Sequence, residues 1–280
     1  MEPLPRFETL ASLPDEAIDV TTGALLIARD LAGAAPRASA GEALAELAAP
    51  LSGLGLEHAT LAAQAEAMRA HLYERCGFAG NEADYYDPKN SLLPEVLTRK
   101  TGIPITLAVI YCDVAARVGI RARGVSFPGH FIVRLEPGRL GRPEAPIFVD
   151  PFFGGRELDE PTLVDMLARV SGKGERLRPE YLAPATPRAI LLRMLMNLRG
   201  IYLSRGDLAR ALIVVDRIAS LTPDSPGALR DRGLLAARLG AGEAAIADLE
   251  RFLQLAPSAD DAGELRAQVD KLRARPRLVN

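Results

Sequence analysis

The sequence is poor in the residues that build disulfide or zinc scaffolds. Its 280 residues include only two cysteines, Cys76 and Cys112, and neither belongs to a CxxC pair. Disulfide-rich domains and structural zinc sites both need more cysteines at closer spacing. The sequence therefore excludes both scaffolds, and we expect no metal and no other cofactor.

Long apolar runs and blocks of one charge are also missing. No apolar stretch reaches the ~18 residues of a membrane-spanning helix. The N-terminus lacks the basic region and apolar run of a signal peptide. The formal net charge is only -2, with 34 Lys and Arg against 36 Asp and Glu and no Lys/Arg-rich block. These absences argue against nucleic acid and membrane partners and predict a cytoplasmic protein.

The N-terminal quarter of the chain has the pattern of helices. Apolar runs occur at residues 24–28 and 43–47, and residues 56–75 carry apolar side chains at helical spacing. His58 and His71 lie in this region without a nearby carboxylate–histidine pattern. Each is predicted to be a surface or half-buried imidazole.

The middle of the chain changes from loop to helix to strand. Residues 77–90 have the composition of a loop, and Pro104 suits the first turn of a helix, where its missing N–H costs nothing. Residues 104–118 carry an apolar stripe broad enough for a buried central helix. Three segments then alternate like half-buried strands: 121–125, 130–135 and 147–149. Because their connections are short, the strands should be antiparallel, and the class is α+β.

The C-terminal third of the chain repeats with a period of 34 residues. Three pairs of identical residues lie 34 positions apart: Gly206 and Gly240, Ala211 and Ala245, and Pro223 and Pro257. This period resembles the tetratricopeptide repeat, a helix–turn–helix unit whose small residues permit close helix crossing. An ordinary helical bundle with accidental spacing is the alternative. Two units cannot easily form a free-standing solenoid, so we expect them to dock onto a preceding domain, with domains at 1–185 and 186–280.

Five short motifs in the middle of the chain resemble a transglutaminase-like, papain-like core. They are YYDPKNS at 85–91, EVL at 95–97, GIPITL at 102–107, PGHF at 128–131 and DPF at 150–152. More narrowly, the chain resembles the SirB1 family of bacterial proteins, in which such a core is followed by tetratricopeptide-like repeats. The resemblance covers about residues 24–256. It implies an α+β core with a helical N-terminal portion, followed by an all-α repeat region.

The resemblance implies a catalytic arrangement that lacks its nucleophile. Such enzymes place a thiolate at a helix N-terminus, a histidine on a neighbouring strand and an acid that orients the imidazole. His130 and Asp150 match the histidine and the acid. The cysteine position falls on Pro104 or Ile105, neither of which is a nucleophile. Thr106 has a hydroxyl but no activating α-amine.

Neither cysteine of the chain is expected to fill the vacant position. Cys112 lies about 12 Å beyond Pro104 along a helix that rises ~1.5 Å per residue. It is predicted to be a buried thiol that behaves as a small hydrophobe. Cys76 lies at a predicted helix end and is expected to be more exposed, with no base beside it.

His130 and Asp150 admit two interpretations that the sequence leaves open. A hydrogen bond between them is either a structural tie between strands or the floor of a binding pocket. The predicted rim of that pocket consists of Tyr86, Asn90, Glu95, Pro104 and Thr106. A metal site made of Glu95, His130 and Asp150 is a third alternative, although no spacing motif supports it.

The sequence thus predicts a non-catalytic, transglutaminase-like pseudoenzyme. Its repeats are expected to bind a protein or peptide in the groove between helices, so that it serves as a scaffold or regulator. The alternative is a hydrolase or acyl transferase that uses His130 and Asp150 with a non-standard nucleophile or an activated water.

Overall fold

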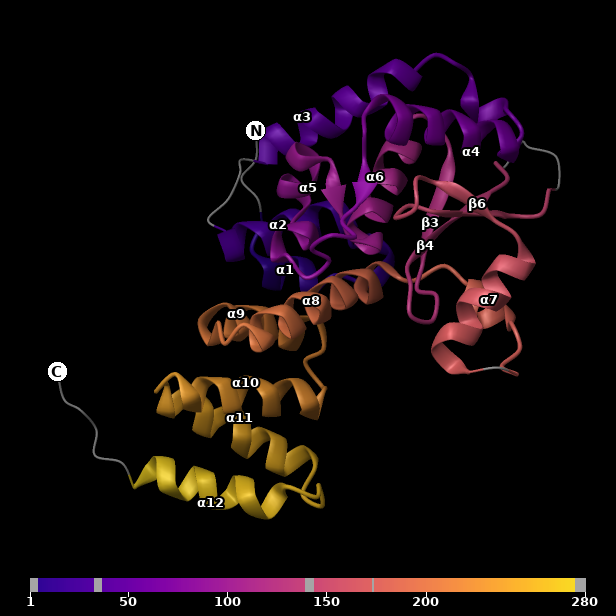
Figure 1. Cartoon of the computed structure of the whole chain (residues 1–280). Helices are drawn as coiled ribbons and strands as arrows, with labels where there is room; N and C mark the ends of the chain where they lie inside the picture. The colour runs from indigo at the N-terminus through magenta and orange to yellow at the C-terminus, as the bar shows by residue number, and fades with distance from the viewer. Residues whose placement is uncertain (1–4, 33–36, 139–143, 173, 275–280) are drawn as a thin grey trace. The chain divides into compact units, whose positions relative to one another are not determined.

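A computed structural model describes residues 5–32, 37–138, 144–172 and 174–274 (Figure 1). The chain forms two compact units. Residues 14–194 belong to the first unit, and residues 5–13 belong with those from 195 onward to the second. The first unit runs past residue 185, where the sequence places the domain boundary, into helix α8 (Pro187–Ser204). The boundary at 185 stays a prediction.

The first unit is built around a buried helix. Its α-helices are α2 (Val20–Ala32), α3 (Arg37–Ala48), α4 (Leu61–Arg69), α5 (Leu93–Arg99), α6 (Pro104–Arg117) and α7 (Glu160–Ser171). Helix α6 contacts α2, α3 and α5 as well as the sheet, and nearly every residue from Pro104 to Ala115 is buried. The predicted central helix is therefore confirmed, with its start at Pro104 as expected.

Short helical turns connect these elements. They are η1 (Asp15–Ala17), η2 (Ala49–Leu51), η3 (Leu56–His58), η5 (Pro88–Ser91) and η6 (Pro179–Leu182), and a π-helical turn, η4 (Ala70–Arg75), continues α4. The π-helical turn sets the spacing between His71 and Cys76.

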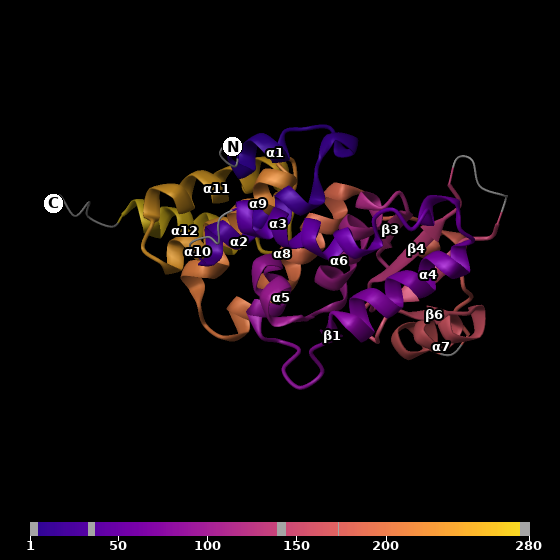
Figure 2. The same cartoon turned by 90° about the horizontal axis from the view of Figure 1, so that it is seen from above.

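Four antiparallel strands form the main sheet, in the order β3 (Arg121–Val125), β4 (Ile132–Glu136), β5 (Ile147–Asp150) and β6 (Arg156–Leu158). The predicted antiparallel α+β core is confirmed, and β6 is an addition to it. Helices α4 and α6 pack on one side of the sheet. Helix α7 lies on the other side of the sheet (Figures 1 and 2). There its Leu163 and Leu167 pack with Phe148 and Leu158 of the strands.

A two-residue parallel pair lies in a region predicted to be loop. Strand β1 (Ala79–Gly80) pairs with β2 (Thr101–Gly102), just before α6. Parallel pairing requires a long crossover, which η5 and α5 supply. Two residues are too few to show an alternating pattern in the sequence, so the pair could be found only from the contact itself.

The second unit consists of paired helices. These are the C-terminal part of α8, then α9 (Leu208–Leu221), α10 (Pro226–Arg238), α11 (Gly242–Leu255) and α12 (Ala262–Arg273). The short helix α1 (Phe7–Ala11) packs against α9, and Arg217 lies 5.5 Å from the centre of the Phe7 ring.

The 34-residue period is a true structural repeat. Gly206 and Gly240 both adopt positive φ, at 71° and 82°, in the turn between two helices. In each turn the residue after the glycine donates its N–H to a carbonyl five residues earlier, at 2.9 Å in both cases. Ala211 and Ala245 are fully buried at the helix crossings. Because geometry repeats together with sequence, accidental spacing is ruled out as the explanation.

No helix in the described part of the chain is long and apolar enough to cross a membrane.

Candidate functional site

His130 and Asp150 meet at one end of the main sheet. Asp150 ends β5, and His130 lies in the turn that precedes β4. Because β4 and β5 are antiparallel neighbours, these positions lie side by side, and His130 Nε2 is 3.0 Å from Asp150 Oδ1. The predicted strand begins two residues late, at Ile132, because Gly129 turns the chain with a φ of 69°.

Asp150 organises the loop that follows it. The residue is fully buried, and its Oδ1 atom also accepts the N–H of Phe152 at 3.0 Å and of Phe153 at 3.3 Å. The Arg156 guanidinium lies 3.8 Å from Oδ2. The two backbone donors and the nearby cation provide partners for this buried carboxyl group.

This arrangement fixes the role of each His130 ring nitrogen. A carboxylate only accepts hydrogen bonds, so Nε2 must carry the proton that it shares with Asp150. In the neutral imidazole, Nδ1 then keeps a free lone pair. Nδ1 has no hydrogen-bond partner among the residues that the structure describes, and 16% of the His130 side chain is exposed. His130 can therefore accept a hydrogen bond from a bound molecule.

A chain of four aromatic side chains begins at His130 and forms what we call the aromatic surface: Phe152 and Phe153 contact the imidazole, Tyr85 contacts Phe152, and Tyr86 contacts Tyr85. Phe153 stacks on the imidazole at a centroid distance of 6.4 Å, and Phe152 meets the imidazole edge-on at the same distance. Tyr86 is 70% exposed, Phe153 43% and Tyr85 41%. Exposed aromatic side chains that cluster together are typical of binding surfaces.

Asn90 holds the tyrosine pair in place from inside the protein. It is fully buried, and its Nδ2 donates to the carbonyls of Asp84 at 2.7 Å and Tyr85 at 3.3 Å. Its own carbonyl accepts the N–H of Ile103 at 3.4 Å, which ties the loop to the start of α6. The predicted rim residue therefore supports the aromatic surface from behind.

Strand β1 also holds one residue of the aromatic surface, Phe152, in place. The Gly80 N–H donates to the Phe152 carbonyl at 3.1 Å, and a Cβ at Gly80 would come within 2.5 Å of the Phe152 ring. Glycine is required because the ring occupies the space that a side chain would need.

The remaining predicted rim residues are Pro104, Thr106 and Glu95, and within the described ranges no hydrogen bond or ion pair joins any of them to His130. Pro104 and Thr106 are buried in α6, and the Thr106 hydroxyl has no hydrogen-bond partner within the described ranges. Glu95 lies 3.9 Å from the Lys89 ammonium.

The described residues contain no group of three His, Cys, Asp or Glu side chains placed to hold a metal ion. The alternative of a metal site made of Glu95, His130 and Asp150 is therefore wrong.

Cys112 lies in the middle of α6, away from the helix start, as predicted from its spacing. Burial raises the pKa of its thiol to about 12, and the charge of Asp113 adds to the effect. At neutral pH the group is a thiol and not a nucleophilic thiolate.

Cys76 corrects a prediction. Its sulfur lies 3.6 Å from His71 Nε2, whereas we expected no base beside it. The π-helical turn brings the two residues together, and the Cys76 N–H donates to the His71 carbonyl at 2.9 Å. His71 is itself buried, against the expectation of a surface or half-buried ring. Its Nε2 also lies 2.7 Å from the Leu47 carbonyl, so Nε2 carries a proton and cannot act as the base for Cys76.

Tyr73 is a site residue that the sequence analysis missed. Its ring packs against Gly155, where a Cβ would lie 2.4 Å from Cε2. Burial raises the pKa of Tyr73 well above its ordinary value, and Tyr111 and Asp150 add to the shift. Tyr73 therefore stays neutral behind the carboxylate. The pattern of apolar residues in its helix offered no signal for this role.

Comparisons with known proteins agree with this architecture. Residues 38–196, more than half of the chain, match the Transglutaminase-like superfamily, and residues 198–270 match the tetratricopeptide repeat. A UPF0162 protein of Xylella fastidiosa is 39% identical over 273 residues, which are 95% of this chain and 94% of the relative. The chain belongs to the UPF0162 family of transglutaminase-like proteins. The predicted order of a transglutaminase-like core followed by repeats is thereby confirmed.

Other relatives show how far the likeness extends. A UPF0162 protein of Pseudomonas aeruginosa is 32% identical over 262 residues, 94% of this chain and 93% of the relative. F-box only protein 21 of Homo sapiens is 36% identical over 96 residues, 33% of this chain and 15% of that protein. The UPF0162 likeness thus spans core and repeats, whereas the F-box likeness is confined to one segment. No solved structure matches the chain.

Proposed function

We propose that this UPF0162 protein is a pseudoenzyme that binds a protein or peptide partner as a scaffold or regulator. One observation carries the proposal: the helix that would present a nucleophile begins with Pro104, Ile105 and Thr106. Of the two thiols, Cys112 is held protonated in mid-helix and Cys76 faces a histidine that has no free lone pair for it. A cytoplasmic location and the narrower SirB1 resemblance belong to the same proposal.

The repeats supply the first binding surface. Tetratricopeptide repeats generally mediate protein–protein interaction. A cavity of about 540 Å³ lies between α9, α10 and α11, a volume typical of ligand sites. Three exposed alanines line it: Ala241 just before α11, and Ala244 and Ala247 within that helix. Small side chains leave space for the side chains of a partner.

Charged residues fix the shape of this groove. Arg232 donates to both carboxylate oxygens of Asp248 at 2.7 Å and to Asp216 at 2.8 Å. All three residues line the cavity. Because the arginine holds one carboxylate from each neighbouring helix, the groove is preorganised and a partner meets a surface of fixed charge.

The aromatic surface supplies a second contact within the core. Tyr86 and Phe153 present large exposed rings, and His130 Nδ1 offers a hydrogen-bond acceptor in the ring on which Phe153 stacks. A peptide N–H could satisfy this acceptor while the rings cover apolar side chains. Here the predicted rim residue Tyr86 keeps its proposed role, whereas Asn90 supports the surface from inside.

Substitutions that fill the groove test the proposal. We expect Ala244→Arg with Ala247→Arg to abolish capture of partners from a bacterial extract by the full-length chain. Ala274→Arg places the same side chain at the exposed end of α12 and should leave capture unchanged. If the double variant retains every partner of the wild type, the groove is not the binding surface.

Hydrolysis is the second candidate function, and the geometry of His130 supports it. A neutral imidazole whose Nδ1 is free and whose Nε2–H is held by Asp150 is oriented to activate a water molecule. This would make the protein a hydrolase without a covalent intermediate. Loss of hydrolysis in His130→Ala, with both thiols blocked by alkylation, would support this candidate over the non-catalytic one.

A further inference from the structure

Arg193 is a partly buried cation beside the aromatic surface, on the part of α8 that folds with the first unit. Its Nη1 atom donates to the Ser126 hydroxyl at 2.5 Å and to the Phe127 carbonyl at 3.4 Å. The His130 N–H donates to the same carbonyl at 3.0 Å. One carbonyl therefore joins the Arg193 guanidinium to the turn that carries His130.

Electrostatic interaction also connects Arg193 with the aromatic surface. Burial raises the pKa of Tyr85, and the positive charge of Arg193 acts against that shift. Burial likewise lowers the pKa of Arg193, and Tyr85 is the titratable group that opposes this change. The guanidinium and the Tyr85 phenol are thus close enough for their charges to interact, which places Arg193 beside the tyrosines of the surface.

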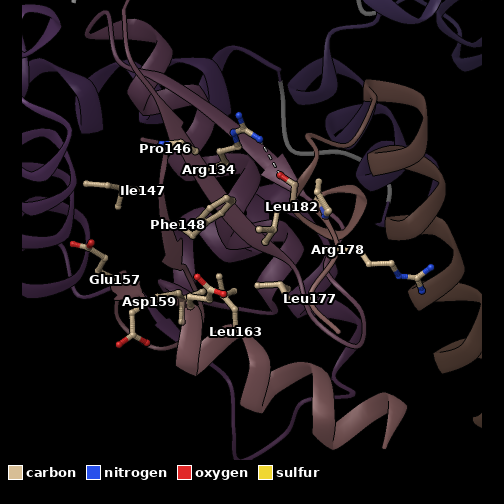
Figure 3. A pocket seen from close by; sticks show the side chains of 13 residues that line it. Arg134, Pro146, Ile147, Phe148, Glu157, Asp159, Leu163, Leu177, Arg178 and Leu182 are labelled. Carbon is tan, nitrogen blue, oxygen red and sulfur yellow. Dashed lines mark hydrogen bonds between the residues drawn. The ribbon is translucent and has the colours of Figure 1, made fainter. Parts of the chain in front are cut away.

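Arg193 differs from the arginines at a cavity of about 560 Å³ between the main sheet and α7, where Figure 3 shows Arg134 and Arg178. Each of those guanidiniums has a carboxylate partner: Arg134 lies 3.2 Å from Glu136, and Arg178 lies 2.7 Å from Glu175. Arg193 has no carboxylate partner among the residues that the structure describes. A partly buried charge without an opposite charge beside it requires an explanation, and a bound anion provides one.

The contacts of Arg193 leave one particular edge of its guanidinium open. Both hydrogen bonds use Nη1, whereas Nε and Nη2 donate to no described residue and still reach solvent. The Nε–H and one Nη2–H point in the same direction, and such an edge can bind a carboxylate through two parallel hydrogen bonds. The guanidinium carbon also lies 5.6 Å from the centre of the buried Phe131 ring, which supports the group. Arg193 is therefore held in place with its carboxylate-binding edge unused.

A second guanidinium lies against the aromatic surface at Phe153. The guanidinium carbon of Arg156 is 4.9 Å from the centre of that ring, and 55% of the Arg156 side chain is exposed. The nearest part of Asp150 is 3.8 Å away, beyond hydrogen-bond distance. The rings of Tyr85 and Phe153 both contact Phe152, at centroid distances of 5.8 and 5.0 Å. Two cations thus flank a short row of aromatic rings.

The number and placement of these cations distinguish between possible anions. A phosphate group is typically bound by a cluster of arginines, whereas these two lie near different rings, Tyr85 and Phe153. A nucleic acid backbone requires a longer basic stretch, and the chain has no Lys/Arg-rich block. The carboxylate at the end of a peptide supplies only one charge. Two acidic side chains with an aromatic side chain between them match the surface instead.

We propose that the aromatic surface binds an extended segment of a partner protein that carries acidic side chains two residues before and two residues after an aromatic one. Alternate side chains of an extended chain face the same side, so all three can reach the surface together. One carboxylate pairs with the open edge of Arg193, the aromatic side chain lies on Tyr85 and Phe153, and the second carboxylate pairs with Arg156. This inference rests on the proposed function, in which the partner is a protein or peptide, and it names the chemistry that the core recognises.

Probe peptides that contain tryptophan test the surface directly, because the chain has no tryptophan and the indole fluorescence of the peptide reports its own binding. The peptides have the sequence Gly-X-Ser-Trp-Ser-X-Gly with both ends blocked, and X is Glu, Gln or Lys. We expect the Glu peptide to bind the full-length chain about ten-fold more tightly than the Gln peptide, as two partly exposed ion pairs would produce, and the Lys peptide to bind most weakly. The preference should decrease in concentrated salt. The Gln peptide with a free C-terminal carboxylate should bind within about three-fold of its blocked form, and a thymidine hexanucleotide should not compete with the Glu peptide.

Variants of Arg193 assign the preference to its guanidinium. Arg193→Gln keeps a donor for the Ser126 hydroxyl but removes the charge, and it should reduce the preference for the Glu peptide to less than about three-fold. Arg193→Lys keeps the charge but loses the edge with two donors, so its preference should lie between those of Arg193→Gln and the wild type. The control is Arg123→Gln, which removes an exposed arginine of β3 and should leave the preference unchanged. Urea unfolding of each variant verifies that the first unit remains folded.

Equal binding of the Glu and Gln peptides, tighter binding of the free C-terminal carboxylate or of the hexanucleotide, or a preference that survives Arg193→Gln would overturn the proposal. These outcomes do not depend on the repeats. If the peptides behave as expected while the groove variants retain every partner, the repeat-binding proposal fails and the acidic-segment site stands. If the peptides show no charge preference while the groove variants lose their partners, only the acidic-segment site fails.

Discussion

Removing the Asp150 carboxylate should destabilise the first unit more than any other change at the site. In Asp150→Ala the N–H groups of Phe152 and Phe153 lose their acceptor inside the protein, at a cost of about 1–3 kcal/mol each. Relief of the buried negative charge offsets part of this cost. We expect a net loss of about 3–5 kcal/mol in the free energy of unfolding.

Two milder variants calibrate this value. Asp150→Asn keeps an acceptor oxygen and loses only the strengthening that a charge gives to a hydrogen bond, so it should cost about 1–2 kcal/mol. His130→Ala removes one of three donors to Oδ1 and should also cost about 1–2 kcal/mol. Because the two residues are in contact, the double variant with alanine at both should cost about 1 kcal/mol less than the sum.

Urea unfolding followed by far-UV circular dichroism measures these energies, and hydrogen exchange at the Phe152 and Phe153 amides locates them. The control is Asp165→Ala, which removes an exposed carboxylate of α7 and should lie within about 0.5 kcal/mol of wild type. A loss below about 1 kcal/mol for Asp150→Ala, or strict additivity with His130→Ala, would refute the role of Asp150 as the organiser of the site.

Three further predictions concern the glycine turn, the thiols and the repeats. Gly154 and Gly155 have φ values of 70° and 68°, but only Gly155 faces a ring, that of Tyr73. Gly155→Ala should therefore lower the free energy of unfolding in urea by about 1–3 kcal/mol more than Gly154→Ala does. Equal losses would contradict the packing of Tyr73 on Gly155. With a pKa of about 12, only ~10⁻⁴ of the Cys112 thiol is ionised at pH 8. Iodoacetamide should therefore modify Cys76 about 10³-fold faster than Cys112, as followed by peptide mass spectrometry. Equal rates would contradict the burial of the Cys112 thiol. Arg232→Met leaves Asp248 without its partner and should destabilise the repeats by about 2–3 kcal/mol in thermal unfolding. Arg251→Met is the control at an exposed arginine. Equal stability of the two variants would contradict a stabilising role for the contact between Arg232 and Asp248.

Local patterns in the sequence were sufficient to predict much of the fold. The start of α6 at Pro104 follows from the fixed φ and missing N–H of proline. The antiparallel strands follow from the alternation of apolar and polar residues and from the short connections between the segments. The repeat follows from the 34-residue spacing of the two glycines that form the turns between helices. In each case the information lies within a few residues of the element that it determines.

The rest depends on contacts between residues far apart in the sequence. The meeting of His130 and Asp150 was predicted from the resemblance to a known core, but the aromatic surface around them depends on how two loops fold together. Asn90 is predicted at the rim of the pocket, whereas its hydrogen bonds to the carbonyls of Asp84 and Tyr85 place it inside, and these contacts form only when the loop folds back on itself. The Cys76–His71 contact was missed because an α-helix would not align residues five apart, as the π-helical turn does.

The central claim is that this protein acts by binding and not by turnover. Its most direct test is to incubate a partner captured through the groove with the full-length chain and to measure the partner's intact mass. We predict a stable complex in which the partner's mass does not change. A change in mass on more than one partner molecule per chain, abolished by His130→Ala, would contradict the claim and make the protein an enzyme.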